Sequence, residues 1–211
     1  MDQDDSVQAG SIEANLALVL GFDASASVTF DEFGLMTRGV AAALRDPAIM
    51  AGLIAGPYRA SYCAVLVWSA AGEQEVMVDW TRIASEAQAR EFADSVENMP
   101  RMVRGATTAI GPALIAALRL LADPPTPAAR SVIDLVGDGR ANDGIEPSIV
   151  RDQAVAAGGT INGLCVLHEE ADLLAYYTEH VIGGSGAFAL ACADFDSFAD
   201  AMMQKLRREI A

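Results

Sequence analysis

Short unbroken apolar runs alternate along this chain with longer segments whose apolar residues recur at helical spacing. The first run, residues 15–22, is apolar on both faces and too short for an ordinary helix, which is typical of a strand buried inside a parallel sheet. Further strands are predicted at residues 62–69, 73–80, 131–139, 160–167 and 187–193. Helices are predicted after Asp31 as far as Asp46-Pro47, then at 84–98, 109–122, 147–157 and 169–180, and finally after Asp194.

This alternation of strands and helices predicts an α/β fold, a doubly wound three-layer α/β/α sandwich with right-handed crossovers. Its six-stranded sheet is expected to be mainly parallel. The tight link at Ala71-Gly72 favours an antiparallel hairpin, which places one antiparallel strand at an edge. Trp68 and Trp80, both in this hairpin, are interpreted as edge-strand packing.

The chain has 211 residues, enough for one α/β domain and few for two. We expect residues 1–13 to be a flexible acidic tail and residues 14–211 to form one domain that is a monomer. No apolar run approaches the roughly 20 residues that span a bilayer. The acidic N-terminus lacks the features of a signal peptide. A periplasmic or secreted protein after signal removal is slightly favoured over a cytoplasmic one.

Charge and cysteine content exclude some functions. The formal net charge is −15, from 29 acidic and 14 basic residues, so the chain would repel a phosphate backbone and is not expected to bind nucleic acid. Cys63, Cys165 and Cys192 lie in apolar, strand-like runs and are expected to be reduced and buried. An odd number of cysteines also prevents complete pairing within one chain.

Polar residues follow several of the predicted strands at the edge where open α/β sheets hold their ligands. Asp23-Ala24-Ser25-Ala26-Ser27 comes directly after the first strand. Residues 105–111, G-A-T-T-A-I-G, lead into a strongly apolar helix, and Gly137-Asp138-Gly139 closes the strand that starts at 131. These segments therefore predict one shared site.

The residues of this site suit a hard cation. Mg²⁺ prefers about six oxygen ligands and readily keeps waters among them. Ser25, Ser27 and Thr108 can offer neutral hydroxyls, while Asp23 and Asp138 offer charged oxygens directly or through water. Two carboxylates so close would repel each other without a cation between them.

D-x-S-x-S, then T-A-I-G-x-A-L, then D-G after a strand resembles the metal-ion-dependent adhesion site of von Willebrand factor A domains. The resemblance covers nearly the whole chain and implies that Asp23, Ser25, Ser27, Thr108 and Asp138 contact the metal. Thr107 is a rival for Thr108, which is preferred because it places T-A-I-G-P-A-L in register. Residues 181–188 and 161–164 are also similar to a bacterial group of stand-alone A-domain proteins of unknown function. Ala26 departs from the family's frequent glycine.

The resemblance implies a binding module for adhesion, assembly or scaffolding, and not an enzyme. The metal, Mg²⁺ with Mn²⁺ or Ca²⁺ as alternatives, would keep one position open for an Asp or Glu of a partner protein. One alternative is an accessory subunit of an ATPase or metal-insertion complex. Another is a metal-dependent hydrolase. A haloacid dehalogenase-type phosphatase, however, would need an Asp where Ser25 stands and a site lysine, whereas the only lysine is Lys205 in the final helix.

Other polar residues receive structural interpretations. Asn142 and Asp143 are expected to be loop and cap residues near the metal rim, and His168 an exposed residue at a helix start. Asp134 interrupts an apolar strand and needs a partner, which we expect near the site. Lys205 is interpreted as one of the cations that suit the end of the last helix.

Overall fold

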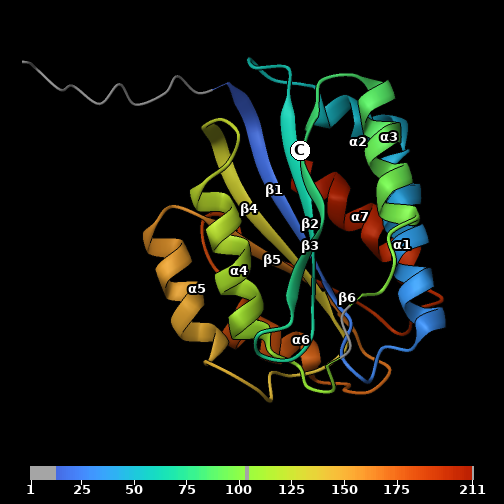
Figure 1. Ribbon diagram of the computed structural model, residues 1–211, viewed down its shortest axis with the longest axis vertical. Helices are drawn as coiled ribbons and strands as arrows, with labels where there is room; N and C mark the ends of the chain where they lie inside the picture. Colours follow the sequence, from blue (N-terminus) through green and yellow to red (C-terminus); the bar gives the residue numbers. More distant parts are fainter. Residues whose placement is uncertain (1–12, 103–104, 211) are drawn as a thin grey trace, which may run out of the picture.

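The computed structural model describes residues 13–102 and 105–210, which form a sheet between two layers of helices (Figure 1). The six strands lie in the order β3-β2-β1-β4-β5-β6. Every neighbouring pair is parallel except β2 and β3, and β3 is an edge strand, as the hairpin predicted. The strands are β1 (Ala14–Asp23), β2 (Ser61–Trp68), β3 (Gln74–Ile83), β4 (Ala128–Gly137), β5 (Thr160–Val166) and β6 (Ala189–Cys192).

Helices cover both faces of this sheet. The layer on one face consists of α1 (Phe30–Leu44), α2 (Pro47–Leu53), α3 (Glu86–Glu97) and α7 (Phe198–Ile210). The layer on the other face consists of α4 (Ile110–Ala122), α5 (Pro147–Ala156), α6 (Leu173–Tyr176) and the π-helical turn η1 (Tyr177–Val181). The predicted three-layer α/β/α architecture is confirmed.

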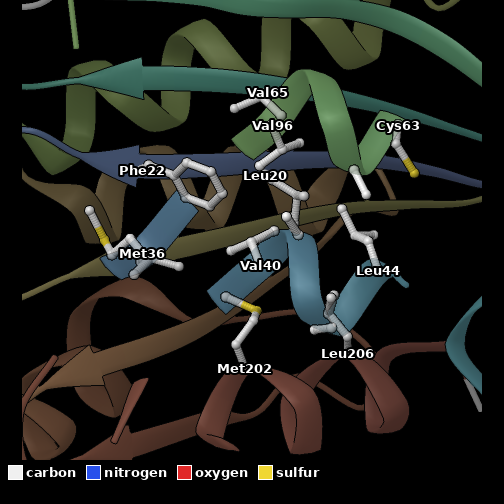
Figure 2. Close-up of a cluster of buried hydrophobic side chains, with 14 of the residues drawn as sticks. Leu20, Phe22, Met36, Val40, Leu44, Cys63, Val65, Val96, Met202 and Leu206 are labelled. Carbon is white, nitrogen blue, oxygen red and sulfur yellow. The ribbon is translucent and has the colours of Figure 1, made fainter. Parts of the chain in front are cut away.

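The larger core lies between the sheet and the α1–α3–α7 layer (Figure 2). Leu20 and Phe22 of β1 point toward Met36 and Val40 of α1, and Met202 of α7 packs beneath them. All five side chains are completely buried. Because β1 alternates its side chains between the two faces, Val19 belongs to the other core and Asp23 points toward that same face.

Short polar signals fix where the first helices begin. Thr29 caps α1 in a capping box with Glu32, since each side chain bonds to the other residue's backbone. Asp46 ends the approach to α2 and caps it, accepting hydrogen bonds from Ala48 and Ile49. The predicted end of α1 near Asp46-Pro47 is confirmed. Pro47 also begins α2, a second helix that the sequence analysis missed.

Two further expectations need correction. The helix predicted at 169–180 is only α6, which passes directly into the π-helical turn η1. Trp68 lies on β2, an interior strand, and is completely buried in the core beneath α4, so it does not pack at a sheet edge.

Lys205 was also misplaced, because it faces the sheet and is completely buried. Its Nζ forms an ion pair with Asp134 in the middle of β4, and lies 3.4 Å from Oε2 of Glu209. Asn162 of β5 donates to both carboxylate oxygens of Glu209, at 2.7 and 2.9 Å. The partner of Asp134 is therefore a lysine of α7, and among the described residues no hydrogen bond or ion pair links Asp134 to the predicted metal site.

The expected tail at residues 1–13 lies outside the described residues except for Glu13. Within the described ranges, no helix combines the length and apolarity needed to cross a bilayer.

The strand order distinguishes one position at the carboxyl ends of the strands, between β1 and β4. From β1 the chain builds toward β2 and β3, and then returns to the other side of β1 to add β4, β5 and β6. The strand order thus reverses between β1 and β4, and the loops that follow these two strands diverge to opposite faces. Their carboxyl ends, at the lower end of the sheet in Figure 1, therefore border the crevice where open α/β sheets bind ligands.

Candidate metal centre

The first loop of the candidate centre starts at Asp23, the last residue of β1. Its carboxylate is completely buried, and Oδ1 accepts a hydrogen bond of 2.7 Å from the backbone N–H of Ser25. The backbone N–H of Ala24 donates to the carbonyl of Trp68 at 2.8 Å, which fixes the loop to the end of β2. The loop therefore turns sharply and keeps the Asp23 side chain inside.

A chain of hydroxyl contacts joins this loop to the end of β4. Ser25 Oγ lies 3.1 Å from Ser27 Oγ, and Ser27 Oγ donates to Asp138 Oδ1 at 2.8 Å. Ser25 is buried and Ser27 is exposed, so the chain runs from the interior to the surface. Four of the five predicted residues are thus brought together by direct contacts.

The fifth residue, Thr108, comes from the loop before α4. Its backbone N–H donates to Asn142 Oδ1 at 2.8 Å, and its carbonyl accepts from the Asn142 backbone at 3.0 Å. Thr108 Oγ1 lies 3.7 Å from the position that a Cβ would take on Gly139, the residue after Asp138. Thr107 instead donates its hydroxyl to Asp143 at 2.8 Å. This arrangement favours Thr108 over Thr107 as the residue facing the centre.

Asn142 and Asp143 act as the loop residues that the sequence predicted. Asn142 holds the Thr108 backbone, while Asp143 accepts from Thr107 and from the backbone N–H of Ala71 at 2.9 Å. They therefore tie the loop after β4 to the loop before α4 and to the β2–β3 turn.

The two carboxylates are in an unfavourable electrostatic environment. Burial, and next the negative charge of Asp138, raise the pKa of Asp23 from its ordinary value of 3.8 to about 7. Burial likewise raises the pKa of Asp138. Oδ2 of each aspartate is buried and has no hydrogen-bond partner in the part of the chain that the structure describes. Each carboxylate thus retains an oxygen able to accept a further contact.

Arg101 is a residue of this region that sequence reasoning missed. Its guanidinium donates to the carbonyls of Ala24 and Ser25, at 2.8 and 2.9 Å, and so supports the loop after β1. The same group lies 4.9 Å from the ring centre of Phe30, whose exposed fraction is 76%. A single arginine in a loop after α3 carries no sequence signal for this contact.

Tyr177 was also missed. Its ring is completely buried on the same face of the sheet as Asp23, and its hydroxyl has no hydrogen-bond partner among the described residues. Burial raises the pKa of Tyr177 well above its ordinary value, and the charges of Cys165, Asp23 and Asp138 add to the effect. Tyr177 is therefore a neutral hydroxyl close to the two aspartates.

The far rim of the centre carries charged side chains. Arg140 pairs with Glu170 at 2.8 Å and with Asp172, and its guanidinium lies over the ring of Tyr176. His168 is exposed, as expected, but it follows β5 and does not begin a helix. Its ring centre lies 5.3 Å from that of Phe195 and its Nε2 3.3 Å from Glu169.

The donor set of the centre fits a hard divalent cation. It offers three hydroxyls and two carboxylates, with neither a thiolate nor an imidazole, which are the ligands that softer metals select. Within residues 13–102 and 105–210 there is no group of three or more His, Cys, Asp or Glu side chains able to hold a metal ion. A cation here would therefore rest mainly on neutral oxygens, with the carboxylates of Asp23 and Asp138 beside it.

Comparisons with known proteins identify a family pattern. The pattern described as "Protein of unknown function (DUF1194)" matches residues 13–211. A search of curated protein sequences finds no match.

Several solved structures share the fold. Proximal thread matrix protein 1 from the mussel byssus, with a zinc-occupied MIDAS motif, has a TM-score of 0.65 at 15% identity, over 96% of this chain and 49% of its own. The pilus adhesin SpaC of Lactobacillus rhamnosus GG has a TM-score of 0.67 at 12% identity, over 96% and 31%. The von Willebrand factor type A protein of Catenulispora acidiphila has a TM-score of 0.59 at 16% identity, over 96% and 47%. The chain thus spans half the length of these relatives or less, and such low identities establish the fold alone.

Proposed function

The chain belongs to the DUF1194 family and has a von Willebrand factor A-like fold, and from this premise we propose that it is a cation-dependent protein-binding module. Ser25, Ser27 and Thr108 would hold Mg²⁺, or Mn²⁺ or Ca²⁺ in its place. Asp23 and Asp138 would contact the cation directly or through water. A carboxylate of a partner protein would complete the coordination.

One observation carries the cation site. Asp23 and Asp138 are linked through Ser25 and Ser27, and each keeps a buried carboxylate oxygen without a partner among the described residues. Two buried like charges are costly, and a cation between them offsets their repulsion. Without a cation, protonation of one carboxyl group would remove the repulsion, and the raised pKa of Asp23 makes its protonation easier.

The choice of an acidic partner follows from the ligand set. Hydroxyl ligands are neutral, so a cation resting mainly on them keeps much of its charge for an outside ligand. Ser27 is exposed and marks the side from which that ligand would approach.

The proposed contact extends onto the adjoining surface. Phe30 and Met102 are 76% and 55% exposed, and the guanidinium of Arg101, the residue before Met102, lies over the ring of Phe30. Exposed large apolar residues beside a polar centre are typical of protein contacts. We therefore expect the partner's acidic residue to have an apolar neighbour that packs on Phe30.

The names of the similar structures support a binding role over catalysis. One is a thread matrix protein and another a pilus adhesin. They also support a location outside the cytoplasm, which fractionation of the native cells would test. If the site were instead that of an enzyme, the protein would hydrolyse phosphate or ester substrates in the presence of Mg²⁺, and Asp23→Ala would abolish this activity.

Calorimetric titration of Mg²⁺ tests the site. We expect one binding event in the wild type and its loss in the Ser25→Ala/Ser27→Ala variant. The matched control is Ser95→Ala, which removes an exposed hydroxyl bonded to Glu91 on α3, far from the loop in sequence. Equal binding by the wild type and the double variant would refute the assignment.

Selection from a displayed peptide library, with Mg²⁺ or with EDTA, tests the partner. In Mg²⁺ we expect enrichment of peptides with an Asp or Glu beside a large apolar residue, and none in EDTA. Phe30→Ser should remove the apolar preference and leave the acidic one. Enrichment that is identical in EDTA contradicts a cation-mediated contact.

A further inference from the structure

Tyr177 carries a polar group that the proposed centre has not yet used. We propose that Tyr177 is a positioning residue for the cation site, whose buried hydroxyl donates through one buried water to Oδ2 of Asp23. This role rests on the proposed function and adds a residue that acts on the metal through Asp23.

The geometry around Gly137 brings the two groups together. A Cβ built on Gly137 would lie 2.6 Å from Tyr177 Oη and 3.2 Å from Asp23 Oδ2. Both atoms therefore border the same small space beside the last residue of β4. Both are buried and lack hydrogen-bond partners among the described residues. One is a donor and the other an acceptor, and because they are not bonded to each other directly, a buried water between them would satisfy both.

Two glycines make room for this side chain. Besides Gly137 at the hydroxyl, Gly163 of β5 lies beneath the ring, where a Cβ would come within 2.7 Å of Tyr177 Cδ1. A side chain in place of either glycine would displace the tyrosine. Tyr177 opens the π-helical turn η1, a type of irregularity that occurs frequently at functional sites.

A partner for the hydroxyl is needed on energetic grounds. Burying a hydroxyl without a hydrogen bond costs on the order of 1–3 kcal/mol, whereas phenylalanine would fill the same space without that cost. The hydroxyl group is therefore explained by a partner, and Asp23 Oδ2 is the acceptor at hand.

The consequence for the site is a fixed carboxylate. Ser25 N–H holds Oδ1 at 2.7 Å, and Tyr177 would hold the other oxygen, so Asp23 could neither rotate nor lend a second oxygen to the metal. Mg²⁺ demands a near-ideal octahedron, while Ca²⁺ accepts more ligands in flexible arrangements. A fixed Asp23 should thus favour Mg²⁺ over Ca²⁺.

The experiment compares Tyr177→Phe with Tyr176→Phe by calorimetric titration of Mg²⁺ and of Ca²⁺. Tyr176 is the matched control, because its hydroxyl accepts from the Ala141 backbone at 3.3 Å on the rim. We expect Tyr177→Phe to weaken Mg²⁺ binding about 10-fold, as removing a group that orients a ligand does. Ca²⁺ binding should change by no more than about 2-fold, since Ca²⁺ tolerates a freer carboxylate. Tyr176→Phe should match the wild type.

Each outcome decides the matter. Unchanged Mg²⁺ binding in Tyr177→Phe, or an equal loss for both cations, overturns the positioning role and leaves the cation site standing. Absence of Mg²⁺ binding by the wild type overturns both. Thermal unfolding in EDTA verifies that Tyr177→Phe is folded. Should it fail to fold, Tyr177→Met, which also removes the hydroxyl and keeps an apolar side chain in its place, replaces it with the same expected loss of selectivity.

Discussion

Asp23 has the most strongly perturbed environment of the five proposed ligands, and its effect on stability depends on pH. Its pKa is about 7 in the folded protein and near 3.8 in an unfolded chain. The stability associated with its protonation is present in full below pH 3.8 and is lost as pH rises through 7. The metal-free protein should therefore lose stability between mildly acidic and mildly alkaline solution.

The expected size of this loss is roughly 2 kcal/mol between about pH 5.5 and about pH 8, or about 4–8 °C in melting temperature. Thermal unfolding in EDTA at the two pH values measures it. Asp23→Asn should reduce the difference by that amount, because other titrating groups contribute equally in both proteins. A pH dependence that is the same in the variant contradicts the raised pKa.

The adjacent threonines provide a second residue-scale prediction. Thr108→Ala should weaken Mg²⁺ binding about 10-fold or more, since it removes a proposed ligand. Thr107→Ala removes a hydroxyl bonded to Asp143 and should leave the Mg²⁺ Kd within about 2-fold of wild type. Calorimetric titration distinguishes them, and the reverse order would assign the metal contact to Thr107.

Among single residues, sequence reasoning could group those that lie in one short loop or directly after a recognisable strand. Asp23, Ser25 and Ser27 lie in one short loop, and Asp138 ends a recognisable strand. Arg101 and Tyr177 could not be found, because their contacts join loops and strands far apart in sequence. No local pattern records such a pairing.

At the scale of elements, α7 is held to the sheet by charge as well as by apolar packing. Lys205 pairs with Asp134 of β4 and Glu209 of α7 itself, and all three side chains are buried. Burial raises the pKa values of both Asp134 and Glu209, while Lys205 opposes the effect. Helix α7 thus brings to the sheet the charge that makes Asp134 tolerable there.

Lys205→Met should destabilise the protein by about 3–5 kcal/mol, because it leaves buried carboxylates without their cation. Arg207→Met is the matched control on the same helix. Its guanidinium is 55% exposed and pairs with Asp46, and such surface pairs contribute about 0–1 kcal/mol. Urea denaturation measures both variants. A loss for Lys205→Met no larger than for Arg207→Met would show that the buried pair is not needed.

Elements were predicted best where one pattern persisted. The buried strands and the apolar helix α4 appear close to their predicted bounds because their hydrophobic periodicity is unbroken. Helix α2 was missed because Pro47 both ends one helix and begins another. Residues 169–180 were predicted as one helix, but α6 and η1 depart from regular spacing to place Tyr177 between two glycines. Tertiary packing overrode the local pattern there.

At the scale of the whole molecule, cation binding at the junction of β1 and β4 should stabilise the entire domain. The proposed ligands come from loops after β1 and β4 and before α4, which unfolding would separate. A ligand that binds only the folded state raises stability by about 2.7 kcal/mol at a concentration about 100 times its Kd. Mg²⁺ should therefore raise the melting temperature of the wild type and not of Ser25→Ala/Ser27→Ala, as differential scanning calorimetry would show.

The net charge of −15 makes a further prediction about binding kinetics. An acidic partner approaches a molecule of the same overall sign, so its association should be slow at low ionic strength and should accelerate as salt screens the repulsion. Stopped-flow measurements with a selected acidic peptide test this dependence. Association that slows with added salt would show that the local charge of the cation and Arg101 dominates.

The doubly wound topology could be predicted from the order of strands and helices, and so could the edge of the sheet that holds the centre. The placement of residues 105–108 against the β2–β3 turn could not, since it depends on contacts such as that of Asp143 with Ala71. The position of these loops therefore depends on the packing of the whole molecule and not on a local pattern.

The concealment of Lys205 has a practical consequence, because it is the only lysine in the sequence. An acylating reagent can modify a lysine side chain of this protein only in molecules whose last helix has come away from the sheet. The rate of that modification therefore measures how often the domain opens, and no other lysine contributes to it.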